Sequence, residues 1–265
     1  MENPEQLIDP LHLEDLRNEL HPSIFDENET YDMLIIRLPL IGKTLDARSL
    51  GFVITSTDSY LYNKSEQRFE ETKSRFEGPH KIMDATMDQV LKSFVQYQEM
   101  IAEMEELLYQ DRSADDFMTH WMELKRDVLR VERILLRSSV TLKAAIEYYE
   151  EAKGFPVNSY ADLHEHMERT MRAAGLQLSK LDYLYNFYNV RTNEKMNRMI
   201  YILTIISAIF LPLNLVVGFF GMNTGGLPFA EGTSGTFKAV LLMVSLVILS
   251  SGILLYLWKR RVEKA

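Results

Sequence analysis

Two long stretches without a charged residue constrain what this chain can fold into. Residues 200–220 (IYILTIISAIFLPLNLVVGFF) and 239–258 (AVLLMVSLVILSSGILLYLW) are almost wholly apolar. A helix of about 20 residues rises about 1.5 Å per residue and spans about 30 Å, the thickness of the hydrocarbon core of a bilayer. Core helices of soluble proteins rarely sustain this length twice, so the sequence predicts two transmembrane helices.

The charges that flank these stretches predict their orientation. Lys195 and Arg198 precede the first stretch, and a basic tail over residues 259–265 follows the second, whereas Glu231 is the one charged residue of the connecting loop, residues 221–236. The positive-inside rule places both termini in the cytoplasm and the loop outside a cytoplasmic (inner) membrane. The first thirty residues carry acids throughout and contain no apolar segment typical of a signal peptide, which agrees with a cytoplasmic N-terminus.

The rest of the chain is acidic and water-soluble in character. Residues 1–198 hold 36 of the 38 acids and 24 of the 29 bases, a net charge of −12, whereas residues 199–265 carry +3. An acidic body disfavours nucleic acid as a partner. The absence of cysteine excludes a disulfide scaffold and a thiolate metal site. We find no phosphate loop, nucleophile elbow or metal-ligand helix, so the sequence indicates no enzyme.

The acidic body divides into two patterns. Residues 31–40 and 50–62 are β-branched and aromatic runs typical of paired strands, and residues 11–20 favour a short helix. We therefore expect a small α/β domain over residues 1–77. Apolar residues then recur every three or four positions, which predicts long cytoplasmic helices, including a stalk, over residues 78–198.

Breaks in the apolar periodicity divide these helices near residues 111–113 and 154–156. The last helix is expected to begin near Ser159, a residue type favoured at N-caps, and to run without proline as far as Pro212. A helix of about sixty residues needs neighbours within the chain or between chains. The predicted fold is an α+β cytoplasmic domain whose long helices continue into two C-terminal transmembrane helices within residues 199–258.

Small and polar residues return to one side of the first apolar stretch, and we call this side the polar face. It consists of Asn197, Thr204, Ser207, Asn214 and Gly218, with Ile200, Leu203 and Leu211 close to the same side. A carboxamide in the membrane costs several kcal/mol unless it finds a partner or water, so Asn214 must meet protein or a water-filled path. On spacing alone, helix packing is favoured over pore lining, and both hold if the helix lines an oligomeric pore.

The number of spans bears on how such a path forms. Two helices per chain cannot enclose a water-filled path and also satisfy their own backbones. Any conduction therefore requires several copies around an axis, and the sequence predicts a homo-oligomer embedded in the lipid bilayer.

A short motif, Gly221-Met222-Asn223, stands at the outer end of the polar face. Residues 197–223, with the core LTIISAIFLPL and the terminal GMN, resemble the CorA family of divalent-cation transporters, whose signature is a long helix that closes on GMN. The DPLHLED sequence of residues 9–15 is similar to the family's HPLxLED. The resemblance implies a homopentamer with a funnel-shaped cytoplasmic domain, with the first-span helices around the pore and the second-span helices outside them.

The resemblance also implies roles for individual residues. Asn223 matches the ring of carboxamides that forms the selectivity filter, with Gly221 and Met222 shaping the turn. Asn214 matches a pore position that is usually threonine, and Asn197 matches a pore asparagine on the cytoplasmic side. Ile200, Leu203 and Leu211 match the hydrophobic constriction. Asp162 lies, by gapless alignment, near an acid at a subunit boundary where the family binds the transported ion and closes the pore.

The resemblance leaves the transported ion open between Mg²⁺ or Co²⁺ and Zn²⁺, and it implies no cofactor. Magnesium-type members place acids just after GMN, whereas this chain has Gly225 and Phe229 there. The GG-x-P sequence of residues 225–228 is more similar to the ZntB branch, which is associated with zinc. Asn186 falls where some members carry an aspartate on the pore axis, so the inner ring is expected to be uncharged.

Other residues and another class of function stay open at this point. Glu99, Glu103, Glu105 and Glu106 form an acidic run that either concentrates cations or is a solvated helix face. His164 and His166 are two residues apart, hence about 200° apart on a helix, and cannot form a metal pair. An alternative from a different class of function is a coiled-coil scaffold that the two spans merely anchor in the membrane.

Overall fold

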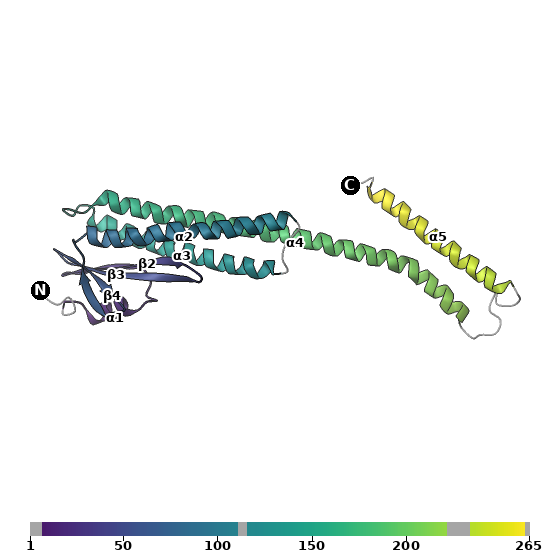
Figure 1. The fold of residues 1–265 in the computed structure, drawn as a ribbon, viewed down its shortest axis with the longest axis horizontal. Coiled ribbons are helices and arrows are strands. Elements are labelled where there is room, and N and C mark those ends of the chain that lie inside the picture. The colour runs from purple at the N-terminus through teal and green to yellow at the C-terminus, as the bar shows by residue number, and fades with distance from the viewer. Residues whose placement is uncertain (1–6, 111–115, 222–233, 263–265) are drawn as a thin grey trace. The chain divides into compact units, whose positions relative to one another are not determined.

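The computed structural model describes residues 7–110, 116–221 and 234–262. Within it the chain forms two compact units, Met1–Asn186 and Phe187–Ala265. The first unit contains the sheet, helices α1 to α3 and the first part of α4, and the second contains the rest of α4 and α5. The fold is the expected one, in which a sheet domain precedes a long helix and a further apolar helix (Figure 1).

The sheet is a five-stranded antiparallel meander in the order β1-β2-β3-β4-β5. Its strands are β1 (Ile24–Glu27), β2 (Asp32–Ile41), β3 (Leu45–Ile54), β4 (Ser59–Asn63) and β5 (Arg68–Glu71). The predicted run over residues 31–40 is β2. The run over residues 50–62 is not one strand, because a turn separates β3 from β4, in which the N–H of Thr55 donates to the carbonyl of Asp58 at 2.8 Å. Sequence analysis missed the two short edge strands, β1 and β5.

Both faces of the central strands are buried, so β2 reads as a nearly continuous apolar run. On one face, Met33, Ile35 and Val53 cluster with Leu16 of α1 (Pro10–Arg17). Because side chains alternate along a strand, Leu34 and Ile36 face the other way, toward the side where α2 and α3 contact β2. Figure 1 shows α1 on one side of the sheet and these two helices on the other.

Helix α1 begins and ends with recognisable signals. The Asp9 carboxylate accepts a hydrogen bond from the N–H of Leu11 at 2.8 Å, and Pro10 occupies the first helical position. The helix ends at Arg17, three residues before the predicted limit, because Asn18 adopts an extended conformation as the C-cap. Local sequence signals therefore predict the start of this helix more accurately than its end.

The long helices are α2 (Glu77–Tyr109), α3 (Phe117–Tyr149), α4 (Val157–Gly221) and α5 (Gly235–Val262). The expectation that Ser159 caps α4 was wrong, because the helix begins two residues earlier. The carbonyl of Pro156 already accepts from the N–H groups of Ser159 and Tyr160. Gly154, at φ +84°, turns the chain before this start, a conformation that glycine adopts without strain.

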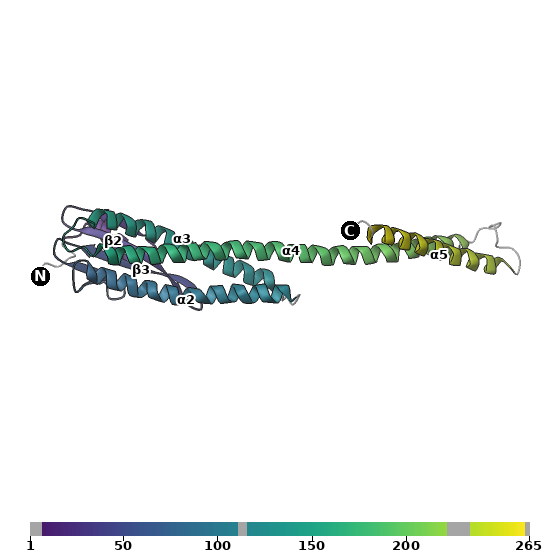
Figure 2. The same ribbon diagram turned by 90° about the horizontal axis from the view of Figure 1, so that it is seen from above.

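Within the first unit, the N-terminal part of α4 packs beside α2 and α3 (Figures 1 and 2). The indole N–H of Trp121 donates to the carbonyl of Leu181 at 2.8 Å, and the buried hydroxyl of Tyr160 donates to the carbonyl of Phe76 at 2.9 Å. An ion pair joins Lys180 to Glu105. These contacts supply the neighbours that a helix of this length requires.

Candidate functional site

The structure places every residue of the predicted polar face on α4, and all of them are exposed in the single chain. Three large apolar residues near that face are more than half exposed: Ile200 at 54%, Leu203 at 62% and Leu211 at 73%. Exposing a continuous patch of large apolar side chains to water is unfavourable, so this surface requires contact with either lipid or a second protein surface. Since Asn214 lies on the same surface, lipid alone does not satisfy it.

The least exposed positions of this segment lie on the other side of α4. They are Ile205, Ala208, Ile209, Pro212, Leu213 and Val216, and Val216 is 7% exposed. At about 100° per residue these positions centre roughly opposite the polar face. The helix therefore has one side that its own chain partly covers and one side, carrying the polar residues, that it leaves open.

The polar groups on the open side differ in how they are satisfied. The hydroxyl of Thr204 donates to the carbonyl of Ile200, one turn earlier, at 2.8 Å. Among the described residues, nothing hydrogen-bonds the side-chain amide of Asn214. Pro212 has no N–H, so the carbonyl of Ala208 lacks its helical donor. On the open side, the Asn214 amide therefore requires water or another chain, whereas Ala208 and its carbonyl belong to the less exposed side of α4.

The apolar part of α4 is long enough to cross a membrane. Within the described residues, Val157–Phe219 is the one helix that meets the length and hydropathy expected of a span, and almost none of its most apolar window is buried. Helix α5 contributes a shorter apolar stretch, Val240–Ser250. The second predicted span, residues 239–258, therefore lies on a helix but is not established as a span by this structure.

The GMN motif is only partly described. Gly221 is the last residue of α4 and is exposed. Met222 and Asn223, which sequence analysis assigned to the filter, lie outside the described residues, as does the loop as far as residue 233. Their roles stay predictions from the sequence.

Asp162, the candidate regulatory acid, lies in the first unit on α4. Its side chain is 69% exposed, and its carboxylate is 3.4 Å from the Nε2 of His166. No group of three or more potential metal ligands gathers anywhere in the described parts of the chain. A cation site at Asp162 therefore requires ligands from water or from a second copy of the chain.

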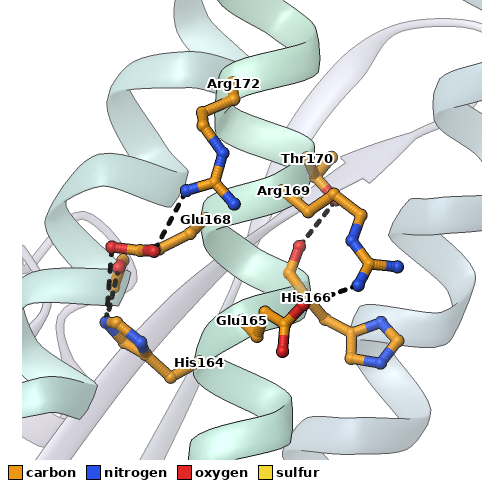
Figure 3. A network of polar contacts seen from close by, with 8 residues as sticks. His164, Glu165, His166, Glu168, Arg169, Thr170 and Arg172 are labelled. Atoms are coloured by element: carbon orange, nitrogen blue, oxygen red, sulfur yellow. Dashed lines mark hydrogen bonds and ion pairs between the residues drawn. The ribbon is translucent and has the colours of Figure 1, made fainter.

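The polar residues that follow Asp162 are paired along the helix. Figure 3 shows His164 and Arg172 converging on Glu168, and Arg169 beside Glu165. A guanidinium nitrogen of Arg169 lies 2.7 Å from the Glu165 carboxylate. The hydrogen bond and the positive charge of Arg169 lower the pKa of Glu165 below its ordinary value. His164 also lies 3.0 Å from the Ser139 hydroxyl on α3, whereas His166 faces Asp162. The two histidines thus have separate partners.

The acidic run on α2 does not act as one cluster. Glu105 is half-buried and pairs with Lys180, and Glu106 accepts a hydrogen bond from Gln110. Glu99 and Glu103 are exposed. This arrangement fits a solvated helix face, one of the two interpretations that the sequence allowed.

Sequence reasoning missed a cluster of four arginines in the first unit. Arg37, Arg130, Arg133 and Arg137 line a hollow beside α3. The available signal was the spacing of three and four residues between the last three of them, which places them on one side of a helix. The contribution of Arg37 has no local signal, because β2 is distant in sequence.

Together these features define a class of protein, in which an N-terminal sheet domain is followed by a long helix that becomes apolar and carries an open polar face. Residues 4–261 match the family described as CorA-like Mg2+ transporter protein. The chain therefore belongs to that family, in agreement with the resemblance found in its sequence.

Curated relatives are similar over different parts of the chain. The divalent cation transporter CmaX of Pseudomonas aeruginosa is 34% identical over 31% of this chain and 25% of its own length. The putative metal ion transporter YfjQ of Bacillus subtilis is 24% identical over 63% and 52%. The zinc transport protein ZntB of Vibrio parahaemolyticus is 21% identical over 87% and 74%. The chain thus spans a quarter of CmaX and about half of YfjQ.

Solved structures share the fold. The complete structure of the CorA magnesium transporter from Methanocaldococcus jannaschii superimposes with a TM-score of 0.75 at 17% identity, over 94% of this chain and 84% of that one. The full-length CmaX structure gives a TM-score of 0.70 at 18% identity, over 94% and 81%. At these identities the likeness establishes the architecture and not the transported ion.

Proposed function

We propose that this chain is one subunit of a homopentameric channel or transporter that conducts a divalent cation across the cytoplasmic membrane. The observation that carries the proposal is the open side of α4, where exposed polar groups end at the first residue of the GMN motif. Family membership and the transporter names of the relatives support it. Both apolar helices then span the bilayer, with the N- and C-termini in the cytoplasm.

In this proposal the five copies of α4 turn their polar faces toward a common axis. The Asn214 amide then meets water in the pore instead of lipid. Ile200, Leu203 and Leu211 form the apolar constriction on the same face. The less exposed side of α4, around Val216, faces the second ring of helices.

Ion selection is assigned to Asn223, with Gly221 and Met222 forming the turn that presents it. Mg²⁺ gives up its inner-shell water reluctantly, so a ring of neutral amides can select the hydrated ion by hydrogen bonds to its waters. Carboxylates at this position would bind the ion more tightly and release it more slowly. Membrane voltage alone drives entry, since a charge of two across 100 mV gains about 4.6 kcal/mol.

Uptake by reconstituted liposomes tests the proposal. The expected result is influx of Mg²⁺ or Co²⁺ in the wild type and loss of selective influx in Asn223→Ala, with the oligomer still intact on size-exclusion chromatography. A wild-type protein that conducts no divalent cation, or an Asn223→Ala variant with unchanged selectivity, contradicts the assignment.

A zinc transporter is the second candidate. It is favoured by the similarity to ZntB over most of the chain and by the Gly225 and Gly226 residues that follow the motif. Parallel uptake measurements with Mg²⁺, Zn²⁺, Co²⁺ and Ni²⁺ separate the two candidates. Influx of Zn²⁺ that Mg²⁺ neither matches nor inhibits would establish the zinc alternative.

We assign a regulatory role to Asp162, as a cytoplasmic ligand of the transported cation at the boundary between subunits. Its exposed carboxylate and its alignment with the family's acid at a subunit boundary support this role. In Asp162→Asn, high internal Mg²⁺ is expected to inhibit influx less than in the wild type. Equal inhibition in both proteins would remove the assignment.

A further inference from the structure

The hollow beside α3 arises from a mismatch in strand length. Strand β1 pairs only with residues 32–35 of β2, and β2 then continues to Ile41 without a neighbour on that edge. Where β1 begins, the hydroxyl of Ser23 accepts a hydrogen bond from the N–H of Arg37. The space between this edge, the segment around Leu20 and Pro22, and α3 has a volume of about 490 Å³. We call it the arginine hollow.

Four arginine residues line the arginine hollow. Arg130, Arg133 and Arg137 follow each other at intervals of three and four residues and so project from one side of α3, and Arg37 joins them from β2. No carboxylate lines the hollow among the described residues. This is unusual in a part of the chain that carries a net charge of −12. Like charges at this proximity are unfavourable unless an anion offsets them.

The arginines differ in their own partners, and most of their donors are unused. Arg130 is held by the Leu45 carbonyl at 2.9 Å and by Asp46 at 3.7 Å. Arg133 and Arg137 make no hydrogen bond or ion pair within the described part of the chain. The Nε of Arg37 is buried without a hydrogen-bond partner. A buried donor that lacks a partner is costly, and a ligand atom in the hollow would satisfy it.

A further basic residue, Lys64, lies near Arg37. Burial lowers the pKa of Lys64, and the nearby positive charge of Arg37 lowers it further against the opposing effect of Glu19. Lys64 donates to the carbonyl of Asn18, which anchors the segment that leads to Leu20. The basic groups thus extend from α3 to the loop that follows α1.

We propose that the arginine hollow binds the phosphate groups of a soluble organic phosphate of about nucleotide size. Planar guanidinium groups match phosphate oxygens through paired hydrogen bonds. The volume of about 490 Å³ lies in the range of small-molecule sites and exceeds the need of a bare phosphate. Leu20, Pro22 and Ile134 offer apolar surface for the organic part. The whole site is made of first-unit residues and includes none from the apolar stretch of α4, which favours a soluble ligand over a lipid headgroup.

The test uses the full chain in detergent and isothermal titration calorimetry with ADP as the probe. EDTA is present so that no metal–nucleotide complex forms. The wild type is expected to bind ADP, to bind pyrophosphate at the same site by competition, and not to bind adenosine. Exposed Arg133 and Arg137 are replaced together in R133Q/R137Q, which is expected to weaken ADP binding about tenfold to a hundredfold. Added salt should weaken wild-type binding as well.

A matched control is R169Q/R172Q, which removes the same charge from exposed arginines on α4 that are paired with glutamates. It is expected to bind ADP like the wild type. Equal ADP affinity in R133Q/R137Q and the wild type, or no binding of any phosphate probe by the wild type, overturns the proposal. So does dissociation of the oligomer in R133Q/R137Q, which would assign the arginines to acids of a second copy. Binding confined to phosphatidylglycerol vesicles would identify a lipid headgroup and also overturn it.

Discussion

The contact between Gly51 and Leu16 allows a quantitative test of how α1 is fixed to the sheet. A Cβ added to Gly51 in β3 would lie 2.6 Å from the Cδ2 of Leu16, whose side chain is fully buried. Since neither group can move into solvent, Gly51→Ala is expected to destabilise the first unit by about 1–3 kcal/mol through overpacking. Leu16→Ala leaves a cavity at the same place and is expected to cost about 2–5 kcal/mol.

The double variant distinguishes this geometry from general damage. In Leu16→Ala, Gly51→Ala, the new methyl group occupies space that the Leu16 side chain has vacated. The cost is therefore expected to fall below the sum of the single variants by at least about 1 kcal/mol. Gly42→Ala is the matched control, because the nearest atom to its new Cβ is the Thr44 carbonyl at 3.9 Å. That substitution should change stability by less than about 0.5 kcal/mol and add to Leu16→Ala without coupling.

Urea unfolding of the full chain in detergent, followed by tryptophan fluorescence, measures these costs. Trp121 reports on the first unit because its ring stacks on Tyr185, with ring centroids 4.8 Å apart, and its N–H is hydrogen-bonded to Leu181. Replacing Trp258 by phenylalanine in every variant leaves Trp121 as the single fluorophore of this type. Strict additivity of the Leu16 and Gly51 substitutions would refute the contact.

Two further predictions concern the pore and the helical bundle. Asn214→Leu is expected to lower divalent-cation influx into liposomes by about tenfold or more, because amide–water hydrogen bonds of about 1 kcal/mol each are lost around the ring of five Asn214 side chains. Val217→Leu, which lies off the polar face, should conduct normally. Equal influx in both variants would place Asn214 away from the ion path. Burial, with a contribution from the Asp127 carboxylate, raises the pKa of Tyr97 to about 12. The stability tied to this shift is complete below about pH 10, where an unfolded tyrosine ionises, and is lost as pH rises toward 12. Between pH 9 and 12, the melting temperature should therefore fall less steeply with pH in Tyr97→Phe than in the wild type. Equal slopes in the two proteins would contradict the raised pKa of Tyr97.

The sequence predicts the parts of the fold that local patterns dictate. Apolar spacing of three and four residues identifies α2 and α3, and the long β-branched run identifies β2. It does not identify β1 (IFDE) or β5 (RFEE), which are short and in which two and three of the four residues are charged. These strands form because a neighbouring strand offers its hydrogen bonds, as where Phe25 pairs with Leu34. Their identity depends on pairing, which a single segment does not encode.

The candidate sites divide in the same way. The polar face of α4 follows from residue spacing along one helix, and the structure adds that its own chain leaves this face open. The arginine hollow requires the fold, because Arg37 and Arg137 are brought together only by the packing of α3 on β2. Asn223 lies outside the described residues, so the filter still depends on the sequence motif.

The neighbour-to-neighbour order of the sheet bears on biogenesis. Each strand pairs with the next one in the chain, so the pairing of the five strands requires no residue beyond Glu71. At typical rates of translation, the ribosome needs on the order of ten seconds more to reach the apolar residues 200–220. Hairpin closure takes microseconds, so the meander has ample time to form before a membrane-targeting signal emerges. A substitution that delays pairing beyond that interval would leave unpaired strand edges present during insertion. The yield in the membrane would then fall even if the mature protein were stable.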